Sequence, residues 1–157
     1  MNVPFAKMHG IGNDFILIDR IAHPQIPVDV IEQNAPFLCD RHFGIGSDGI
    51  LVVEPSSRDG IDLVYRMYNP DGSEAEMCGN GIRCFGKWVY ENGHTDKRTI
   101  TVETKAGDLV LELNGDGAVV DSVRVDMGPA RLSRPEIPMT GPDGPAVSEI
   151  LDVNGHD

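Results

Sequence analysis

Short apolar runs separated by turns rich in glycine, proline and asparagine dominate this chain, and helical spacing occurs in only two places. Runs of β-branched and aromatic residues, some with alternating polar and apolar positions, predict strands. The predicted strands are 5–8, 15–19, 50–54, 61–68, 99–104, 109–113 and 118–125. Many strands with few helices, in no regular alternation, predict an α+β fold with a mixed or antiparallel sheet.

Two helices are predicted, and the stronger pattern covers residues 81–92. Its apolar residues recur at intervals of three and four, as on a buried stripe: Ile82, Phe85, Trp88 and Val89. Gly86 would allow close approach of a sheet, and Gly93 suits the position just past the helix end. A second helix is predicted over 28–39, with Asp29 as its N-cap and Pro36 weakening the pattern. Its expected inward residues are Val30, Ile31, Phe37 and Leu38.

The character of the chain changes after Met127. Residues 128–145 contain five prolines, and a short apolar piece, 146–153, follows. This composition is typical of a connection that leads into further structure, so we expect the sequence to be part of a longer protein.

Composition and charge narrow the classes of partner. With 40% hydrophobic and 24% charged residues, the sequence is typical of a folded globular protein. Its 25 acidic against 13 scattered basic side chains give a net charge of −12, which disfavours nucleic acid as a partner. We find neither an apolar run long enough to span a membrane nor a secretory signal, and we expect a cytoplasmic protein with reduced thiols.

The segment Glu76–Cys84 carries the most informative chemistry. It places Cys78 at the start of the predicted helix, beside Gly79, Asn80 and Gly81. Amides at a helix N-terminus favour negative charge, so they would stabilise a thiolate and could also hold a substrate carboxylate. One short segment could thus supply both a reactive sulfur and an anion clamp, which indicates an enzyme.

Two other patterns contain the residues of known binding motifs but lack the context or the spacing that those motifs require. Residues 44–49 match the G-x-G-x-x-G dinucleotide fingerprint, but a predicted helix precedes them and a strand follows, which is the reverse of the required context. We interpret them as a glycine-bearing loop. Cys39 and His42 could begin a zinc site with Cys78 and Cys84, but the cysteine spacing is too wide for the usual tight pairs. We therefore predict packed thiols at Cys39 and Cys84, and no metal.

For Cys78 itself the residues leave several roles open. It could be a structural cysteine at a strand-to-helix corner. It could be a nucleophile, as in a thiol hydrolase, which would need one of His9, His42 and His94 beside it. It could also abstract a proton from carbon, which requires a bound carboxylate and a second acid or base on the opposite face.

Three segments together resemble the diaminopimelate epimerase family in order and separation. They are MHGIGNDF at 8–15, CDRHFGIGSDG at 39–49 and YNPDGSEAEMCGNGIRC at 68–84. The resemblance runs from about residue 3 to the end of the chain and weakens after about Val125. It implies an amino-acid epimerase without pyridoxal phosphate or another cofactor, in which one cysteine thiolate removes the α-proton and an opposite thiol reprotonates the other face. The substrate would be LL-2,6-diaminopimelate, converted to the meso form for lysine and cell-wall precursor synthesis.

The resemblance also assigns residues. Cys78 matches the first catalytic cysteine, Asn13 and Asn69 match substrate-binding side chains, and Gly79 with Asn80 match helix-start amides that hold the α-carboxylate. Some family members carry a glutamine that contacts substrate where this chain has Gly49. The second catalytic cysteine of the family would lie beyond the matched region, so we expect the polypeptide alone to lack appreciable epimerase activity.

The family fold implies two similar domains, each a curved mixed sheet wrapped around a central helix. We place a first domain, carrying Cys78, at residues 1–117 and the linker and start of a second at 118–157. The resemblance further implies a homodimer. Related isomerases of the same fold that act on proline, hydroxyproline or a phenazine precursor, and a non-catalytic amino-acid-binding module, remain alternatives.

Overall fold

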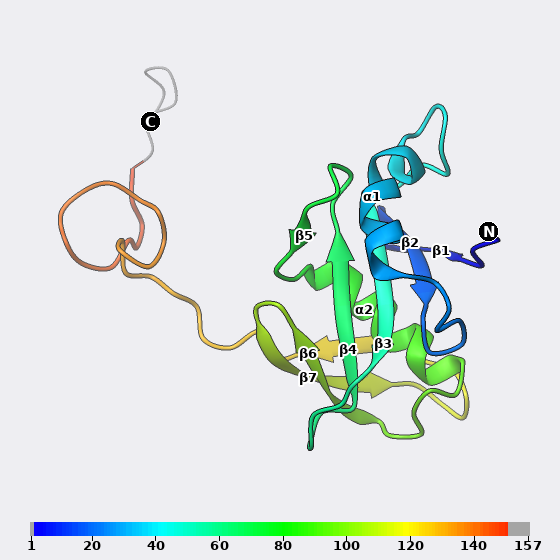
Figure 1. Ribbon diagram of the computed structural model, residues 1–157. Coiled ribbons are helices and arrows are strands. Elements are labelled where there is room, and N and C mark those ends of the chain that lie inside the picture. Colours follow the sequence, from blue (N-terminus) through cyan, green and yellow to red (C-terminus); the bar gives the residue numbers. More distant parts are fainter. Residues whose placement is uncertain (1, 151–157) are drawn as a thin grey trace. The chain divides into compact units, whose positions relative to one another are not determined.

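A computed structural model describes residues 2–150 and contains two helices and eight strands in the described part (Figure 1). The strands are β1 (Ala6–Gly10), β2 (Asn13–Asp19), β3 (Gly49–Pro55), β4 (Leu63–Tyr68), β5 (Glu74–Ala75), β6 (Thr99–Thr104), β7 (Gly107–Asn114) and β8 (Ser122–Val125). The helices are α1 (Val28–Cys39) and α2 (Gly79–Glu91). The chain divides into two compact units, one up to Asp126 and one from Met127.

All eight strands form one mixed sheet in the order β1-β2-β3-β4-β6-β7-β8, with β5 paired to β4. The pairs β2/β3 and β4/β6 are parallel and the others are antiparallel. A parallel pair needs a crossover, and α1 lies in the connection between β2 and β3 while α2 lies in that between β4 and β6. The predicted α+β class with a mixed, curved sheet is confirmed.

The sheet curves around α2, which packs against strands from both edges and from the middle of the sheet (Figure 1). Ile82, Phe85 and Val89 are fully buried on this helix, as their spacing predicted, whereas Trp88 is half-buried. A Cβ on Gly86 would lie 3.0 Å from Leu113 Cδ2, so the glycine permits the predicted close approach of the sheet. The central helix is therefore fixed by burial on several sides.

The other face of the sheet is covered by α1, which buries Ile31, Ala35 and Cys39. Two details of the prediction are wrong. The N-cap is Pro27 rather than Asp29, which lies in the first turn, and Phe37 is 60% exposed rather than inward. The expected bounds of the helix are confirmed despite its internal proline.

The boundary after Asp126 differs from the expected one at residue 117. The strand β8 pairs with β7 in register from Leu111↔Val125 to Asn114↔Ser122, and so belongs to the first unit. It is shorter than the predicted strand 118–125, because residues 115–121 form the connection from β7. The division of function between two domains stays a prediction.

In the second unit, the structure describes residues 127–150, which hold one isolated bridge, Ser133↔Pro145. Arg134 donates to the Pro142 carbonyl at 2.9 Å and to the Glu149 carboxylate. The piece 151–153 of the predicted apolar run lies outside the described residues.

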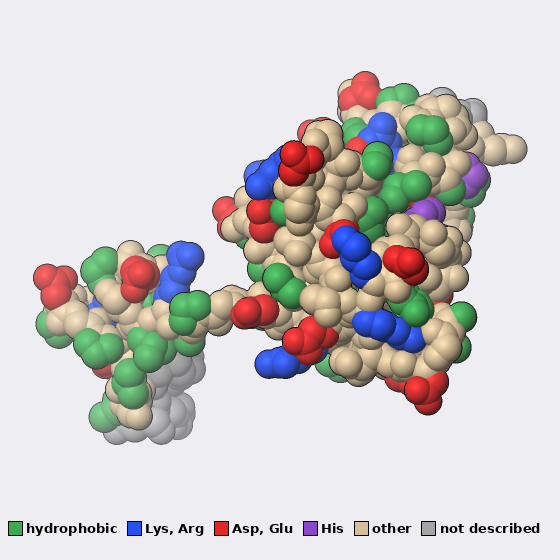
Figure 2. Space-filling model, turned by 90° about the horizontal axis from the view of Figure 1, so that it is seen from below, with side chains coloured by type: hydrophobic (Ala, Val, Ile, Leu, Met, Phe, Trp, Pro, Cys, Tyr) green, Lys and Arg blue, Asp and Glu red, His purple; other side chains and the backbone are tan. Residues whose placement is uncertain are grey.

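On the face shown in Figure 2, acidic and basic side chains lie interspersed. Among the described residues many charged side chains are paired, as in Arg58 with Asp108 at 2.8 Å. Within residues 2–150, neither helix is long and apolar enough to cross a bilayer.

Candidate functional site

The start of α2 is set by the chain that leads from β4. After β4 the chain turns at residues 69–73, pairs briefly with β4 again as β5, and reaches Cys78 in an extended conformation. Cys78 is the N-cap of α2, and its carbonyl accepts the first helical hydrogen bond from the Ile82 amide at 2.8 Å. The sequence predicted this helix to begin at Gly81, two residues later than it does.

A glycine is needed at position 81, two residues after the first residue of α2. A Cβ on Gly81 would lie 2.7 Å from the Tyr65 hydroxyl and 2.9 Å from Leu51 Cδ2, closer than non-bonded atoms approach. The first turn can therefore press against β3 and β4 only because this residue has no side chain. Gly79 has no neighbour within 4 Å of such a Cβ, so its surroundings are open.

The first amides of α2 are available to an anion. The Cys78 side chain makes no capping hydrogen bond, and the first turn holds no acidic residue. The N–H groups at a helix start have no partner within the helix and carry partial positive charge. The half-buried Cys78 side chain stands beside these groups, so the site combines a thiol with an amide cradle suited to a carboxylate.

Asn13 lies against this helix start. The turn from β1 to β2 consists of two residues, Ile11 and Gly12, both with positive φ, as a tight hairpin requires. It brings Asn13 to the Cys78 sulfur, with 3.7 Å between Sγ and Asn13 Oδ1. The same oxygen accepts a hydrogen bond from Asn80 Nδ2 at 3.2 Å. The predicted site residues Asn13, Cys78, Gly79 and Asn80 are thus brought together.

Arg83 fixes the Asn80 side chain from the next turn of the helix. Its guanidinium donates to Asn80 Oδ1 at 2.6 Å and to the Gly79 carbonyl at 2.8 Å. The Asn80 amide nitrogen is therefore the end that faces Asn13. Sequence reasoning missed Arg83, although a residue three positions after Asn80 lies on the same helix face and could have been considered.

Asn69 does not join this group by any hydrogen bond within the described residues. Its amide nitrogen donates to Ser73 Oγ at 3.0 Å, and its backbone N–H donates to the Ser73 carbonyl. Ser73 also donates to Asp71 Oδ1 at 2.6 Å. Asn69 is thus a turn residue at the end of β4, and its predicted contact with substrate stays a prediction.

The other two cysteines are packed, as predicted. Cys39 and Cys84 are buried, and burial raises the pKa of both thiols. Cys39 accepts a hydrogen bond from Ser47 Oγ at 3.3 Å. No group of three or more His, Cys, Asp or Glu side chains suited to a metal ion occurs in the described part of the chain.

In the glycine-rich segment 44–49, residues 44–48 form a loop between α1 and β3, Gly49 begins β3, and no helix opens on the segment. Backbone amides of this loop donate to a carbonyl in the last turn of α1. The N–H groups of Ile45 and Gly46 both donate to the Leu38 carbonyl at 3.0 Å. The interpretation as a glycine-bearing loop is confirmed, and the nucleotide fingerprint does not have its structural context.

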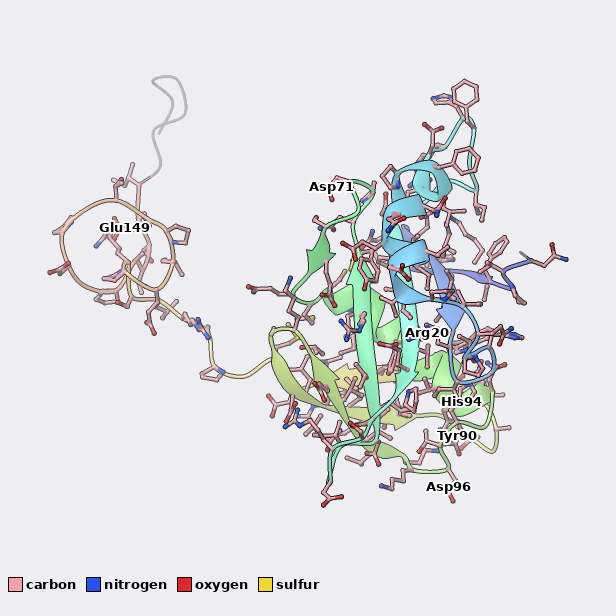
Figure 3. All side chains as sticks on the ribbon, in the orientation of Figure 1. Arg20, Asp71, Tyr90, His94, Asp96 and Glu149 are labelled. Carbon is pink, nitrogen blue, oxygen red and sulfur yellow. The ribbon has the colours of Figure 1, made fainter. Side chains whose placement is uncertain are left out.

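None of the three candidate histidines hydrogen-bonds to Cys78 in the described structure. His9 and His42 are exposed, and His94 Nε2 lies 2.5 Å from Asp19 Oδ2. His94 follows the C-terminal end of α2 (Figure 3), and a helix of 13 residues puts about 20 Å between its ends. Within residues 2–150, no histidine forms with this sulfur the hydrogen-bonded pair that a thiol hydrolase requires.

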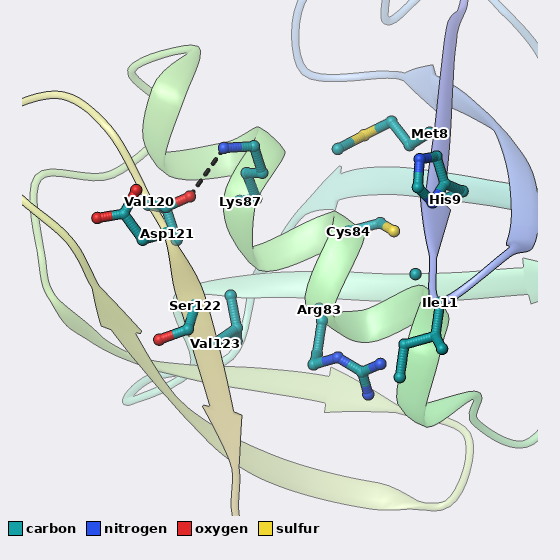
Figure 4. Close-up of a pocket in the computed structure, with 11 residues that line it drawn as sticks. Met8, His9, Ile11, Arg83, Cys84, Lys87, Val120, Asp121, Ser122 and Val123 are labelled. Atoms are coloured by element: carbon teal, nitrogen blue, oxygen red, sulfur yellow. Dashed lines mark hydrogen bonds between the residues drawn. The ribbon is translucent and has the colours of Figure 1, made fainter.

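A groove of about 420 Å³ lies on the side of α2 between β1 and β8, and does not include Cys78 (Figure 4). His9 and Ile11 line it from the β1 side, and Cys84 lies at its base. At one end of this groove, Lys87 Nζ donates a hydrogen bond to the Val120 carbonyl at 2.8 Å.

Comparisons with known proteins decide the family. The family model described as diaminopimelate epimerase matches residues 5–133. The chain belongs to the diaminopimelate epimerase family. A diaminopimelate epimerase of Heliobacterium modesticaldum is 51% identical over 150 residues, covering 95% of this chain and 53% of the relative. One of Methanothermobacter thermautotrophicus is 48% identical over 154 residues, covering 98% and 53%. The chain spans about half the length of these curated relatives.

Solved structures support the fold alone. A hydroxyproline epimerase from Agrobacterium vitis, with bound trans-4-hydroxy-L-proline, aligns with a TM-score of 0.61 at 16% identity over 77% of this chain and 40% of that one. A methylitaconate-Δ-isomerase aligns with a TM-score of 0.62 at 15% identity, over 76% of this chain and 36% of that one. The expected fold of the diaminopimelate epimerase family is confirmed.

Gly49, the position that the resemblance matches to a substrate-contacting glutamine in some relatives, is closely enclosed. A Cβ at this position would lie 2.8 Å from the Tyr68 carbonyl oxygen and 2.9 Å from Met67 Cε. In this structure no side chain fits at position 49 without movement of β4, so a glutamine contact of that kind is absent here.

Proposed function

We propose that this chain is the half of a diaminopimelate epimerase that binds the α-carboxylate of LL-2,6-diaminopimelate and supplies one acid–base thiol, Cys78. The observation that carries the proposal is the juxtaposition of Cys78, uncapped amides at the start of α2, and Asn13. Membership of the family supports the substrate and the reaction class.

The chemistry follows from the positions of these groups. A carboxylate held by the Gly79 and Asn80 amides would place the adjacent α-carbon near the Cys78 sulfur. The thiolate form of Cys78 would remove the α-proton, and the resulting negative charge would spread into the carboxylate that the amides hold. Inversion then requires proton delivery from the opposite face.

The second proton donor would come from outside this chain. Of its three cysteines, Cys39 and Cys84 are buried in the two cores, and Cys78 alone is partly accessible. A thiol on the opposite face therefore has no candidate among the described residues. We infer that the 157 residues alone have no appreciable epimerase activity, need no cofactor, and act within a cytoplasmic homodimer of the whole protein.

The test is exchange of the substrate α-proton in deuterated water. The chain alone should show little exchange or epimerisation, whereas a chimera carrying the remaining half of the Heliobacterium relative should show both. Cys78→Ala in the chimera should abolish activity, and Cys84→Ala should retain it. Turnover by the isolated chain close to that of the full-length relative, or activity of the Cys78→Ala chimera, would contradict the proposal.

Substrate choice needs a panel, because related folds act on other compounds. We expect the chimera to act on LL- and meso-diaminopimelate and not on proline or 4-hydroxyproline. Calorimetry with diaminopimelate on the isolated chain would show whether it binds without turnover.

A further inference from the structure

Asp48 is the third group in contact with the Asn13 side chain. It lies in the loop just before β3, and its Oδ2 accepts a hydrogen bond from Asn13 Nδ2 at 2.8 Å. The same oxygen accepts the Asp14 backbone N–H at 3.0 Å, and the Asp48 N–H donates to the Asp14 carbonyl at 2.9 Å. The carboxylate is therefore held against the start of β2 from two sides.

Arg41 keeps Asp48 in place. Its guanidinium nitrogen Nη2 donates to Asp48 Oδ1 at 2.8 Å and to Asp14 Oδ1 at 2.6 Å. The hydrogen bond from Asn13 and then that from the Asp14 backbone lower the pKa of Asp48. At neutral pH the group is thus a carboxylate, which accepts hydrogen bonds and donates none.

That property decides which way round the Asn13 amide lies. A carboxylate can only receive the Asn13 N–H₂ group, so the carbonyl end must point away from Asp48. It points to the Cys78 sulfur at 3.7 Å and receives the Asn80 amide at 3.2 Å. If the Asn13 amide were reversed, its N–H₂ group would face the two donors that its carbonyl oxygen now faces, the Cys78 S–H and the Asn80 N–H₂ group.

We propose that Asp48 is a positioning residue, which fixes the Asn13 side chain so that its carbonyl oxygen, not its N–H₂ group, faces the Cys78 sulfur. The catalytic meaning of this arrangement depends on the function proposed above. An oxygen in that position accepts the S–H proton and favours the thiol form, whereas an N–H₂ group would favour the thiolate. Asp48 would thereby set how readily Cys78 returns a proton.

A carboxylate suits this position better than an amide does. Donors face Asp48 on both sides, from Arg41 at Oδ1 and from Asn13 and Asp14 at Oδ2. An asparagine could accept on one side only and would present its own N–H₂ group to a donor on the other. Asp48→Asn should therefore give a weaker form of the effect of Asp48→Ala.

The experiment measures the rate of Cys78 alkylation by iodoacetamide against pH, on the full 157-residue chain, with the modified residue identified by mass spectrometry. Asp14→Asn is the matched control. It removes one negative charge that also pairs with Arg41, but within residues 2–150 no hydrogen bond joins the Asp14 side chain to Asn13. The titratable neighbours of Cys78, Tyr65 of β4 and Cys84 of α2, have raised pKa values and stay uncharged near pH 7.

Asp48→Ala should raise the rate at pH 7 about two- to tenfold above that of Asp14→Asn, the factor for one hydrogen bond gained or lost. The pH of half-maximal rate should fall accordingly. In an Asn13→Ala background, Asp48→Ala and Asp14→Asn should give the same rate, because the coupling acts through Asn13.

Two results would overturn the proposal. One is that Asp48→Ala and Asp14→Asn have equal alkylation rates when Asn13 is present. The other is that the rate of Asp48→Ala exceeds that of Asp14→Asn by the same factor in the Asn13→Ala background as with Asn13 present. Circular dichroism checks that each variant folds, and if Asp48→Ala does not, Asp48→Asn carries the same comparison. The readout needs no substrate, so it can succeed or fail independently of the exchange assay that tests the proposed function.

Discussion

Replacing Gly81 with alanine tests whether close packing of α2 sets the geometry at Cys78. The new methyl group would lie 2.7 Å from the Tyr65 hydroxyl and 2.9 Å from Leu51 Cδ2. Both neighbours are fully buried in the core around α2, so neither can move into solvent. The first turn of the helix must therefore shift, or the sheet must.

The expected cost is the difference between two effects. Extra atoms forced into a packed core typically cost about 1–3 kcal/mol. Alanine is better than glycine inside a helix by up to about 1 kcal/mol. We expect Gly81→Ala to lower the free energy of unfolding by up to about 2 kcal/mol, and by about 1–3 kcal/mol relative to a Gly→Ala replacement with open surroundings. For a chain of this size, a loss of about 2 kcal/mol is a fall of roughly 4–8 °C in the melting temperature.

Urea denaturation followed by circular dichroism measures this, with Gly79→Ala as the control in the same turn. Gly79 has open surroundings, so its replacement should be neutral or slightly stabilising. Tyr65→Phe removes the nearer obstacle and should recover part of the loss in the double variant. If Gly81→Ala is as stable as Gly79→Ala, or Tyr65→Phe recovers nothing, the packing explanation is wrong.

Three further predictions follow from buried groups. Cys84→Ala should cost only about 1 kcal/mol of stability and leave the alkylation rate of Cys78 unchanged; an altered rate measured by mass spectrometry would show that Cys84 tunes the site. Burial alone would raise the pKa of Asp19, but hydrogen bonds from the Ala22 backbone, Trp88 and His94 leave it below the ordinary 3.8. Asp19 therefore contributes stability that is complete above that value and is lost as pH falls through the lower pKa of the folded state. Asp19→Asn should make the free energy of unfolding depend less steeply on pH between about pH 5 and 2. An unchanged dependence on pH, measured by urea denaturation, would refute this. Gly49→Ala should destabilise the chain by about 1–3 kcal/mol in urea denaturation because it meets the Tyr68 carbonyl, and a neutral result would show that β4 yields easily.

Periodicity predicted the elements well where burial follows one clear pattern. The stripe Ile82, Phe85 and Val89 located the central helix, alternation located β4, and a run of β-branched residues located β6. The start of α2 was placed two residues late, because Gly79–Gly81 has poor helix propensity and only its packing against Tyr65 and Leu51 explains the glycines. The exposure of Phe37 was missed for a similar reason, since Ala35 and Cys39 occupy the inner face of α1.

The candidate site was only partly predictable. Local spacing identified Cys78 with its helix-start amides, and resemblance added Asn13. The roles of Asp48 and Arg41 could not be read from spacing, because they depend on a hydrogen-bond network between β2 and the loop before β3. The short strand β5, which delivers the chain to Cys78, has too few residues to give a pattern.

The role proposed for Cys78 requires that the start of α2 stabilises negative charge beside its sulfur. The most direct measurement is the ratio of alkylation rates by iodoacetate and iodoacetamide at Cys78, in the folded chain and in the chain unfolded by guanidinium. The net charge of −12 is the same in both states, whereas the helix amides act only in the folded one. If the helix start stabilises negative charge, folding should raise the ratio about two- to fivefold, and Cys78 should react before Cys39 and Cys84. A ratio that is unchanged or falls on folding would show that the helix start does not act on this sulfur.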